Sequence, residues 1–141
     1  MINLSSFDSI APVYDLFTSL FRRRIPARVV SRLKPGDRDM ILDLGGGTGY
    51  NAARIQRACR QVVVLDISFR MLRNARKYSN LDLVVADALN LPFKQKGFDV
   101  ALAVDSIHHI GDHTEVLKEI KRVGKNKVLV AEFFGRTCLG R

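Results

Sequence analysis

The chain has 141 residues, of which 47% are hydrophobic and 26% are charged, a balance typical of one globular domain with a buried core. No apolar run is long enough to cross a membrane, and the first residues lack the pattern of a secretory signal. The two cysteines, Cys59 and Cys138, show neither disulfide nor metal-ligand spacing. We therefore expect a cytoplasmic protein with reduced thiols and no metal ion.

The charge is strongly basic. Twenty-three lysines and arginines against fourteen acidic residues give a formal net charge of +9. The basic residues are scattered over segments 22–24, 70–77 and 118–127, on or beside predicted helices. They indicate either solvated helix faces or a surface for RNA or another anionic partner.

Two helices are predicted near the amino terminus. Apolar residues recur at helical spacing from Ile10 to Phe21, with Ser9 as the N-cap. A second helix is predicted over Pro26–Leu33, and Pro35-Gly36 ends it. Residues 1–36 are therefore expected to form a helical cap.

From residue 37 the pattern alternates between strands and helices. The predicted strands are nearly continuous apolar runs, as expected for strands buried on both faces of a parallel sheet; they are Met40–Leu44, Gln61–Leu65, Leu81–Val85, Asp99–Val104 and Lys127–Phe133. The predicted helices between them are Gly49–Arg60, Phe69–Tyr78 and His113–Val123. This order implies an α/β fold: a doubly wound, mainly parallel sheet of about five strands with helices on both faces.

The segment from Leu89 to Gly97 is predicted to be mainly a loop. Residues 37–134 then make the core, and residues 135–141 a tail, of a single domain spanning 1–141. In a sheet of this kind, a ligand binds outside the carboxyl ends of the strands, at the switch point beside the first strand.

A glycine-rich loop follows the first predicted strand. It contains Gly45, Gly46, Gly47 and Gly49. Because glycine has no Cβ, such a loop turns sharply and lets a ligand approach the main chain. The order of strand, glycine loop and helix is the context in which a nucleotide-cofactor motif is credible.

Four aspartates fall at or just after the carboxyl ends of successive predicted strands: Asp43, Asp66, Asp87 and Asp105. A single aspartate could simply cap the next helix, but four in register indicate a site. Asp66 lies 19 residues beyond Gly47, about the separation at which an acidic residue accepts hydrogen bonds from a ribose diol. Asp87 could accept from the amino group of a base.

Asp43 helps to choose between cofactors. The stretch Gly47–Ala52 fits the relaxed dinucleotide fingerprint, so a fragment of an NAD-linked dehydrogenase is one reading. A carboxylate beside the loop would repel a pyrophosphate. It would attract a cofactor that carries an amino group and a sulfonium, and S-adenosylmethionine has both, together with a ribose and an adenine.

The chain resembles the class I S-adenosylmethionine-dependent methyltransferases, in particular the ubiquinone/menaquinone-biosynthesis type and its small relatives. Residues 43–49 match the family's D-x-G-x-G-x-G loop, and residues 66–72 match its D-x-S-x-x-M-L segment. Residues 86–88 with 91–93 resemble its D-A…L-P-F segment, 98–100 with 108–110 its fourth-strand signature, and 7–15 the helix that closes over the cofactor. The resemblance implies a Rossmann-like fold and a methyltransferase whose cofactor is S-adenosylmethionine and whose product is S-adenosylhomocysteine.

The resemblance also implies roles for single residues. Asp66 would bind the ribose hydroxyls, Met71 would line the adenine pocket, and Asp87 with the next backbone N–H would read the adenine edge. Asp105 is a candidate for the methionine end. The full set expected to bind the cofactor is Asp43, Gly45, Gly46, Gly47, Gly49, Asp66, Ile67, Met71, Asp87, Ala88 and Asp105.

The chain departs from the family pattern at its carboxyl end. Members normally continue past the fifth strand through a helix and an antiparallel strand pair, and this sequence stops at Arg141. We therefore expect a core without that pair, in which the strand over 127–133 is an exposed edge. A second subunit or the C-terminal tail is expected to cover it, so a homo-oligomer is one expectation.

The acceptor and any general base are less well specified. Asp105, His108, His109 and Tyr14 are candidate catalytic residues, although His109 could be structural and Tyr14 could belong to a helix core. The resemblance favours a small-molecule acceptor, such as a quinone precursor. Two alternatives stay open: a cofactor-binding module or subunit that needs a partner for activity, and an RNA-directed methyltransferase.

Overall fold

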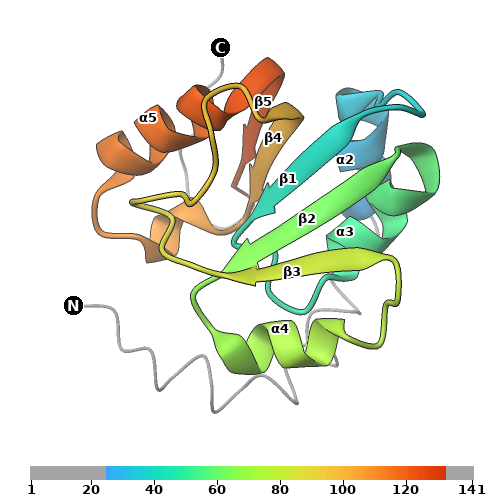
Figure 1. Cartoon of the computed structure of the whole chain (residues 1–141), viewed down its shortest axis with the longest axis horizontal. Helices are drawn as coiled ribbons and strands as arrows, with labels where there is room; N and C mark the ends of the chain where they lie inside the picture. Colours follow the sequence, from blue (N-terminus) through green and yellow to red (C-terminus); the bar gives the residue numbers. More distant parts are fainter. Residues whose placement is uncertain (1–24, 133–141) are drawn as a thin grey trace.

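A five-stranded sheet forms the centre of the part of the chain that the structure, a computed structural model, describes: residues 25–132 (Figure 1). Its strands are β1 (Met40–Leu44), β2 (Gln61–Asp66), β3 (Leu81–Val85), β4 (Phe98–Val104) and β5 (Gly124–Ala131). They lie in the order β3-β2-β1-β4-β5, and every pairing is parallel. The order reverses between β1 and β4, which confirms the predicted doubly wound α/β architecture and places the switch point beside β1.

The helices are short and follow the predicted order. They are α2 (Ile25–Leu33), α3 (Tyr50–Ile55), α4 (Phe69–Ala75) and α5 (His113–Val123), with single 3-10 turns η1 (Gln56–Ala58) and η2 (Ile107–His109). The helix expected from Ser9 onward lies outside the described residues. No helix within residues 25–132 is both long and apolar enough to span a bilayer.

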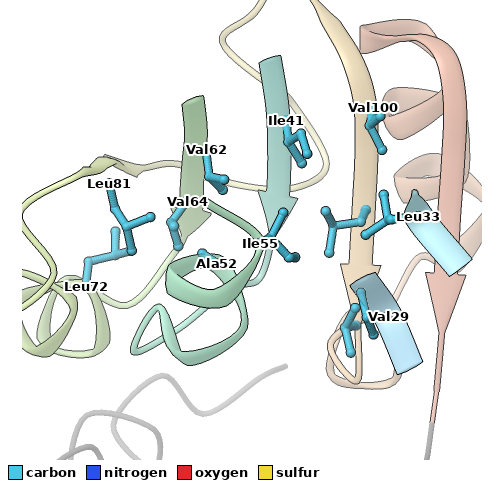
Figure 2. Close-up of a cluster of buried hydrophobic side chains, with 12 residues drawn as sticks. Val29, Leu33, Ile41, Ala52, Ile55, Val62, Val64, Leu72, Leu81 and Val100 are labelled. Atoms are coloured by element: carbon cyan, nitrogen blue, oxygen red, sulfur yellow. The ribbon is translucent and has the colours of Figure 1, made fainter. Parts of the chain in front are cut away.

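One face of the sheet is covered by α2, α3 and α4. Alternate strand residues point to this side, since side chains alternate along a strand. Ile41, Val62, Val64 and Val100 are among them, and they pack against Val29 and Leu33 of α2, Ala52 and Ile55 of α3 and Leu72 of α4 (Figure 2). Within the predicted cap, Val29 and Leu33 of α2 thus pack into this core cluster.

The opposite face is covered by α5 and by the loop after β3. Leu42, Leu44, Val63 and Leu65 point to it, and they pack against the buried stripe of α5: Val116, Ile120 and Val123. Figure 1 shows α5 on the other side of the sheet from α2 and α3. Two apolar layers thus hold the sheet, and they place the carboxyl ends of its strands at a common edge.

Three elements have boundaries that differ by more than one residue from the sequence-based expectation. The helix predicted over Gly49–Arg60 ends at Ile55, because the side chain of Gln56 accepts the N–H of Val62 and donates to the carbonyl of Arg60. The helix predicted over Phe69–Tyr78 ends at Ala75.

The third difference is at the last strand. It was expected over 127–133, but β5 begins at Gly124, directly after α5, and ends at Ala131. Its position at the sheet edge confirms the expectation of an exposed edge strand, and Val128 is 37% exposed and Val130 36% exposed there.

Candidate functional site

A pocket opens at the carboxyl ends of β1, β2, β3 and β4, where the sequence places the row of aspartates. All four of these aspartates line it. So do the loop after β1, the start of α4, the loop after β3 and the segment that follows β4. The sheet topology therefore brings together aspartates that are up to 62 residues apart in the sequence, as Asp43 and Asp105 are.

Asp43 is the most unusual ionisable group in the pocket. Its residue is 2% exposed, and its Oδ2 atom has no hydrogen-bond partner among residues 25–132. Burial, and to a lesser degree the nearby Asp66 carboxylate, raises the pKa of Asp43 to about 7. A buried carboxylate without a partner is costly, so this position favours a ligand that brings a positive charge or a hydrogen-bond donor.

The glycine loop holds its shape through the neighbouring strands. The N–H of Gly45 donates to the carbonyl of Leu65 at 2.7 Å. Gly45 has a φ of +70°, and a Cβ added there would lie 2.5 Å from Cβ of Ser106. Ser106 is itself fixed, because its Oγ donates to the carbonyl of Leu44 at 3.0 Å. Only glycine fits this close approach between the ends of β1 and β4.

Asp66 organises the side of the pocket beside β2. Its Oδ2 accepts the N–H of Gly47 at 3.0 Å, and its Oδ1 accepts the N–H of Ser68 at 2.9 Å. Ser68 caps α4, since its Oγ accepts the N–H of Met71. This chain of hydrogen bonds holds the glycine loop against α4 and places Met71 in the pocket wall.

Asp87 and Ala88 line the pocket from the loop after β3. The Asp87 side chain is exposed, and its Oδ1 accepts the N–H of Leu89 at 2.9 Å. Asp87 therefore caps a turn of this loop, where no helix follows, in place of the helix cap considered for a lone aspartate. This leaves lone pairs of the carboxylate for a ligand.

An arginine–glutamate pair on α5 holds the next part of this loop. Arg122 donates to both carboxylate oxygens of Glu119, and to the carbonyls of Leu91 and Phe93. Glu119 in turn accepts the N–H of Leu91 at 2.7 Å. We call Glu119 and Arg122 the α5 clamp.

The segment after β4 forms the remaining wall. Asp105 is buried and has a φ of +53°, a conformation that a non-glycine residue rarely adopts and that often marks functional sites. Its N–H donates to the carbonyl of Ala131 at 2.7 Å, which ties this segment to the end of β5. His109 lines the pocket beside it, and the two rings of His108 and His109 have centroids 3.8 Å apart.

The predicted site residues are therefore largely brought together. Every residue expected to bind the cofactor lines the pocket except Gly49. Gly49 is the N-cap of α3 with a φ of +75°, and a Cβ there would lie 3.0 Å from Leu81 and 3.1 Å from Ala75. Gly49 therefore lies where the start of α3 packs closely against β3 and α4.

The candidate catalytic residues do not all line the pocket. Asp105 and His109 line the pocket, whereas His108 does not. His108 instead lies 2.6 Å from Glu132 through its Nδ1 atom. Tyr14 lies outside the described residues.

Sequence reasoning missed several polar residues of the pocket: Thr48, Tyr50, Asn51 and Ser106. Asn51 carries a buried Oδ1 atom without a hydrogen-bond partner in the described part of the chain. Ser106 could have been noticed as a second polar residue directly after the strand end at Asp105. Asn51 gave no such signal, because asparagine in a predicted helix is ordinary.

Most of the described residues match a known protein family. The model of the methyltransferase domain matches residues 42–131, from β1 to the end of β5. The demethylmenaquinone methyltransferase of Corynebacterium kroppenstedtii is 34% identical over 133 residues, covering 90% of this chain and 58% of that protein. The enzyme of the same name from Streptomyces avermitilis is 35% identical over 138 residues, covering 92% and 59%. This chain thus spans a little over half the length of these relatives.

Solved structures show the same fold. A chain of the complex between the Haloferax volcanii Trm112 methyltransferase activator and a putative methyltransferase superposes with a TM-score of 0.78 at 26% identity, over 84% of this chain and 55% of that one. The PH0226 protein of Pyrococcus horikoshii gives a TM-score of 0.66 at 34% identity, over 74% and 53%. The family match extends over the whole sheet and the loops that build the pocket, and the chain belongs to the methyltransferase domain family.

Proposed function

We propose that the chain binds S-adenosylmethionine in this pocket and transfers a methyl group to a small-molecule acceptor, with S-adenosylhomocysteine as the product. The observation that carries the proposal is the buried carboxylate of Asp43, which lies in one pocket with the glycine loop, Asp66 and Asp87. The family match supports it independently.

The charge of the pocket fits this cofactor. Asp43 Oδ2 and Asn51 Oδ1 are buried acceptors without a hydrogen-bond donor among the described residues. An ammonium group would supply both positive charge and N–H donors to these atoms, and a sulfonium would supply positive charge. A dinucleotide would instead bring a pyrophosphate next to Asp43 and Asp66, whose carboxylates already repel each other.

The adenosine end fits the other half of the pocket. Each Asp66 oxygen accepts one backbone N–H, and a carboxylate has room for further hydrogen bonds from a ribose diol. Ile67 and Met71 provide apolar surface for a base, and Asp87 with Ala88 lies on the same side. Ile67 is 49% exposed, so binding a base would cover apolar surface.

When bound, the cofactor would supply a methyl group already activated by its sulfonium. The residues of this chain would then hold the donor and the acceptor close and in line, which accounts for a large part of such a rate enhancement. A general base is needed only if the acceptor must lose a proton. Asp105 and His109 line the pocket and are our candidates for that role.

A quinone precursor is the acceptor class that we propose. The named activity of the relatives from Corynebacterium and Streptomyces supports it. The alternative is a subunit that needs a partner for activity. It is worth testing because one structural neighbour comes from a complex with a methyltransferase activator. The transfer assay described below tests it. A cytoplasmic location remains a prediction.

Calorimetric titration of the chain with S-adenosylhomocysteine and with NAD tests the cofactor. We expect saturable binding of S-adenosylhomocysteine, and Asp66→Ala should weaken it by roughly 10- to 100-fold, since it removes hydrogen bonds to a charged group. Asp82→Ala, on the exposed side of β3, is the matched control and should bind like wild type. Binding of NAD alone would overturn the proposal.

Transfer itself is then measured with S-adenosylmethionine labelled in the methyl group and a demethylated quinol as acceptor. Label in the quinol supports the proposed acceptor class. Cofactor binding without transfer, followed by transfer when a second protein is added, would show that the chain is a partner-dependent subunit.

A further inference from the structure

Three potential metal ligands meet beside the pocket, at the ends of β4 and β5. Nδ1 of His108 lies 2.6 Å from Oε2 of Glu132 and 3.7 Å from Oδ1 of Asp105. One ligand atom from each residue lies within 4.8 Å of the other two. The Asp105 side chain is 3% exposed, that of Glu132 21% and that of His108 36%, so the cluster is reached from solvent on the imidazole side.

One Nδ1 atom cannot hydrogen-bond to both carboxylates in this arrangement. It lies 2.6 Å from Oε2 of Glu132, while Oδ1 of Asp105 lies beyond hydrogen-bond distance of it at 3.7 Å. A divalent cation in place of the proton would interact with the Nδ1 lone pair and both carboxylates at once. Two carboxylates and one imidazole form the mixed oxygen and nitrogen donor set that suits Mn²⁺ or Zn²⁺.

The spacing of the three atoms is close to that of ligands on one cation. With metal–ligand bonds of about 2.0–2.2 Å, ligand atoms lie roughly 3 to 4 Å apart. The separations of 3.7 Å, and of up to 4.8 Å, are near this range. The His108–Glu132 separation of 2.6 Å is shorter, so the exposed imidazole would have to move outward by a few tenths of an ångström.

The backbone holds two of the ligands in place without a metal. Asp105 donates its N–H to Ala131, the residue before Glu132. The second oxygen of Glu132, Oε1, accepts the N–H of Ile107 at 2.8 Å. The ends of β4 and β5 are thereby joined on both sides of the cluster, so little ordering would be needed when a cation binds.

We propose that Asp105, His108 and Glu132 form a binding site for a divalent cation such as Mn²⁺ or Zn²⁺. The sequence predicts no metal, because Glu132 lies 24 residues beyond His108 and the three residues match no known metal motif. Asp105 also lines the pocket, and His108 stacks on the pocket residue His109. If the proposed methyl transfer holds, the cation would lie where it can bind an acceptor oxygen and favour its deprotonated form.

The site is tested by titrating the full chain with MnCl₂ after any purification tag has been removed. Electron paramagnetic resonance follows the binding of Mn²⁺. We expect one Mn²⁺ per chain and a pulsed-resonance signature of one coordinated imidazole nitrogen. His108→Ala and Glu132→Gln should each weaken binding at least about tenfold, since even groups outside the ligand shell have effects of that size. His113→Ala and Glu115→Gln, in the exposed first turn of α5, should bind Mn²⁺ like wild type.

The titration needs neither cofactor nor acceptor, so its failure is distinct from failure of the proposed methyl transfer. No saturable binding to wild type up to millimolar MnCl₂ would overturn the site. A bound ion without nitrogen coupling would overturn it as well, and this measurement on wild type does not depend on the folding of a variant. Unchanged affinity in both folded variants would have the same meaning.

Discussion

Strand register determines the position and the burial of the Asp43 side chain. It pairs with Val64 on one side and Leu102 on the other, in the middle of the sheet, so its carboxylate is buried by the same contacts that bury the apolar residues around it. This burial raises the pKa of Asp43 to about 7. The position is costly to stability and suited to a cationic ligand, as expected for a functional residue.

The first prediction concerns the pH dependence of stability. Between the ordinary pKa of 3.8 and the folded value of about 7, the folded protein keeps a proton on Asp43 that the unfolded chain has released. The contribution of Asp43 to the free energy of unfolding therefore falls as the pH rises through this window. We expect Asp43→Asn to gain stability relative to wild type between pH 4 and pH 8, by up to about 4 kcal/mol.

Urea denaturation of both proteins across this pH range measures the difference. Its pH dependence is the relevant quantity, because the amide has packing and hydrogen-bonding effects of its own that do not change with pH. Parallel profiles for wild type and variant would show that Asp43 titrates normally in the folded state.

The α5 clamp shows how one element positions another. Glu119 and Arg122 lie one turn apart on α5, yet their hydrogen bonds hold the backbone of Leu91 and Phe93, just after the pocket residues Asp87–Leu89. The side-chain hydrogen bonds from Arg122 lower the pKa of Glu119. The clamp is therefore fully formed at neutral pH, and its contribution is lost as the pH falls from the ordinary value of 4.5 through the lowered one.

The second prediction is that Arg122→Gln lowers the urea midpoint at pH 7 and weakens binding of S-adenosylhomocysteine. The reason is that the variant removes the donors that hold two loop carbonyls and leaves Glu119 without its bidentate partner. Lys118→Gln is the control, because Lys118 forms an exposed pair with Glu115 on the same helix at the same spacing. Such pairs contribute little. Equal effects of the two substitutions would contradict the role of the clamp.

Gly45 gives a third prediction, which concerns how the ends of β1 and β4 meet. An added methyl group at this position would lie 2.5 Å from Ser106, and the φ of +70° is unfavourable for alanine. We expect Gly45→Ala to lower the thermal midpoint and to reduce cofactor affinity together. The double variant Gly45→Ala with Ser106→Gly should recover part of both, because it removes the Cβ that clashes; no recovery in calorimetry would show that this contact is not the cause.

At the scale of the molecule, β5 leaves an edge that is long and partly apolar. Within residues 25–132 it pairs only with β4, and Val128 and Val130 are exposed on it. Exposed edges of this kind are ready to pair with another chain. The expected homo-oligomer is consistent with this geometry and remains a prediction.

The fourth prediction is that the chain dimerises through β5. In light scattering coupled to size-exclusion chromatography, wild type should have the mass of a dimer, and Val130→Lys should shift it toward the monomer by placing charge on the edge. Val85→Lys, on the opposite edge strand where the side chain is 53% exposed, is the control and should stay dimeric. A monomeric wild type would contradict the prediction.

The element order, the fold class and the row of aspartates could all be predicted from the amino-acid sequence. It could do so because apolar runs such as Gln61–Leu65 and the stripe of α5 are local patterns that burial imposes on any sequence with this fold. The glycine loop and Asp66 were equally readable, since each follows a strand directly and the carboxyl ends of parallel strands share one edge.

The packing of the whole chain determines which residues meet in the pocket and which are near it in sequence alone. It separated Gly49 from the pocket, brought Glu132 to His108, and joined the α5 clamp to a loop 28 residues away from Glu119. The end of α3 shifted as well, because the Gln56 side chain bonds to the backbone of Arg60 and Val62 beyond the helix. Contacts between segments depend on register and packing across the whole sheet, and no local sequence pattern carries that information.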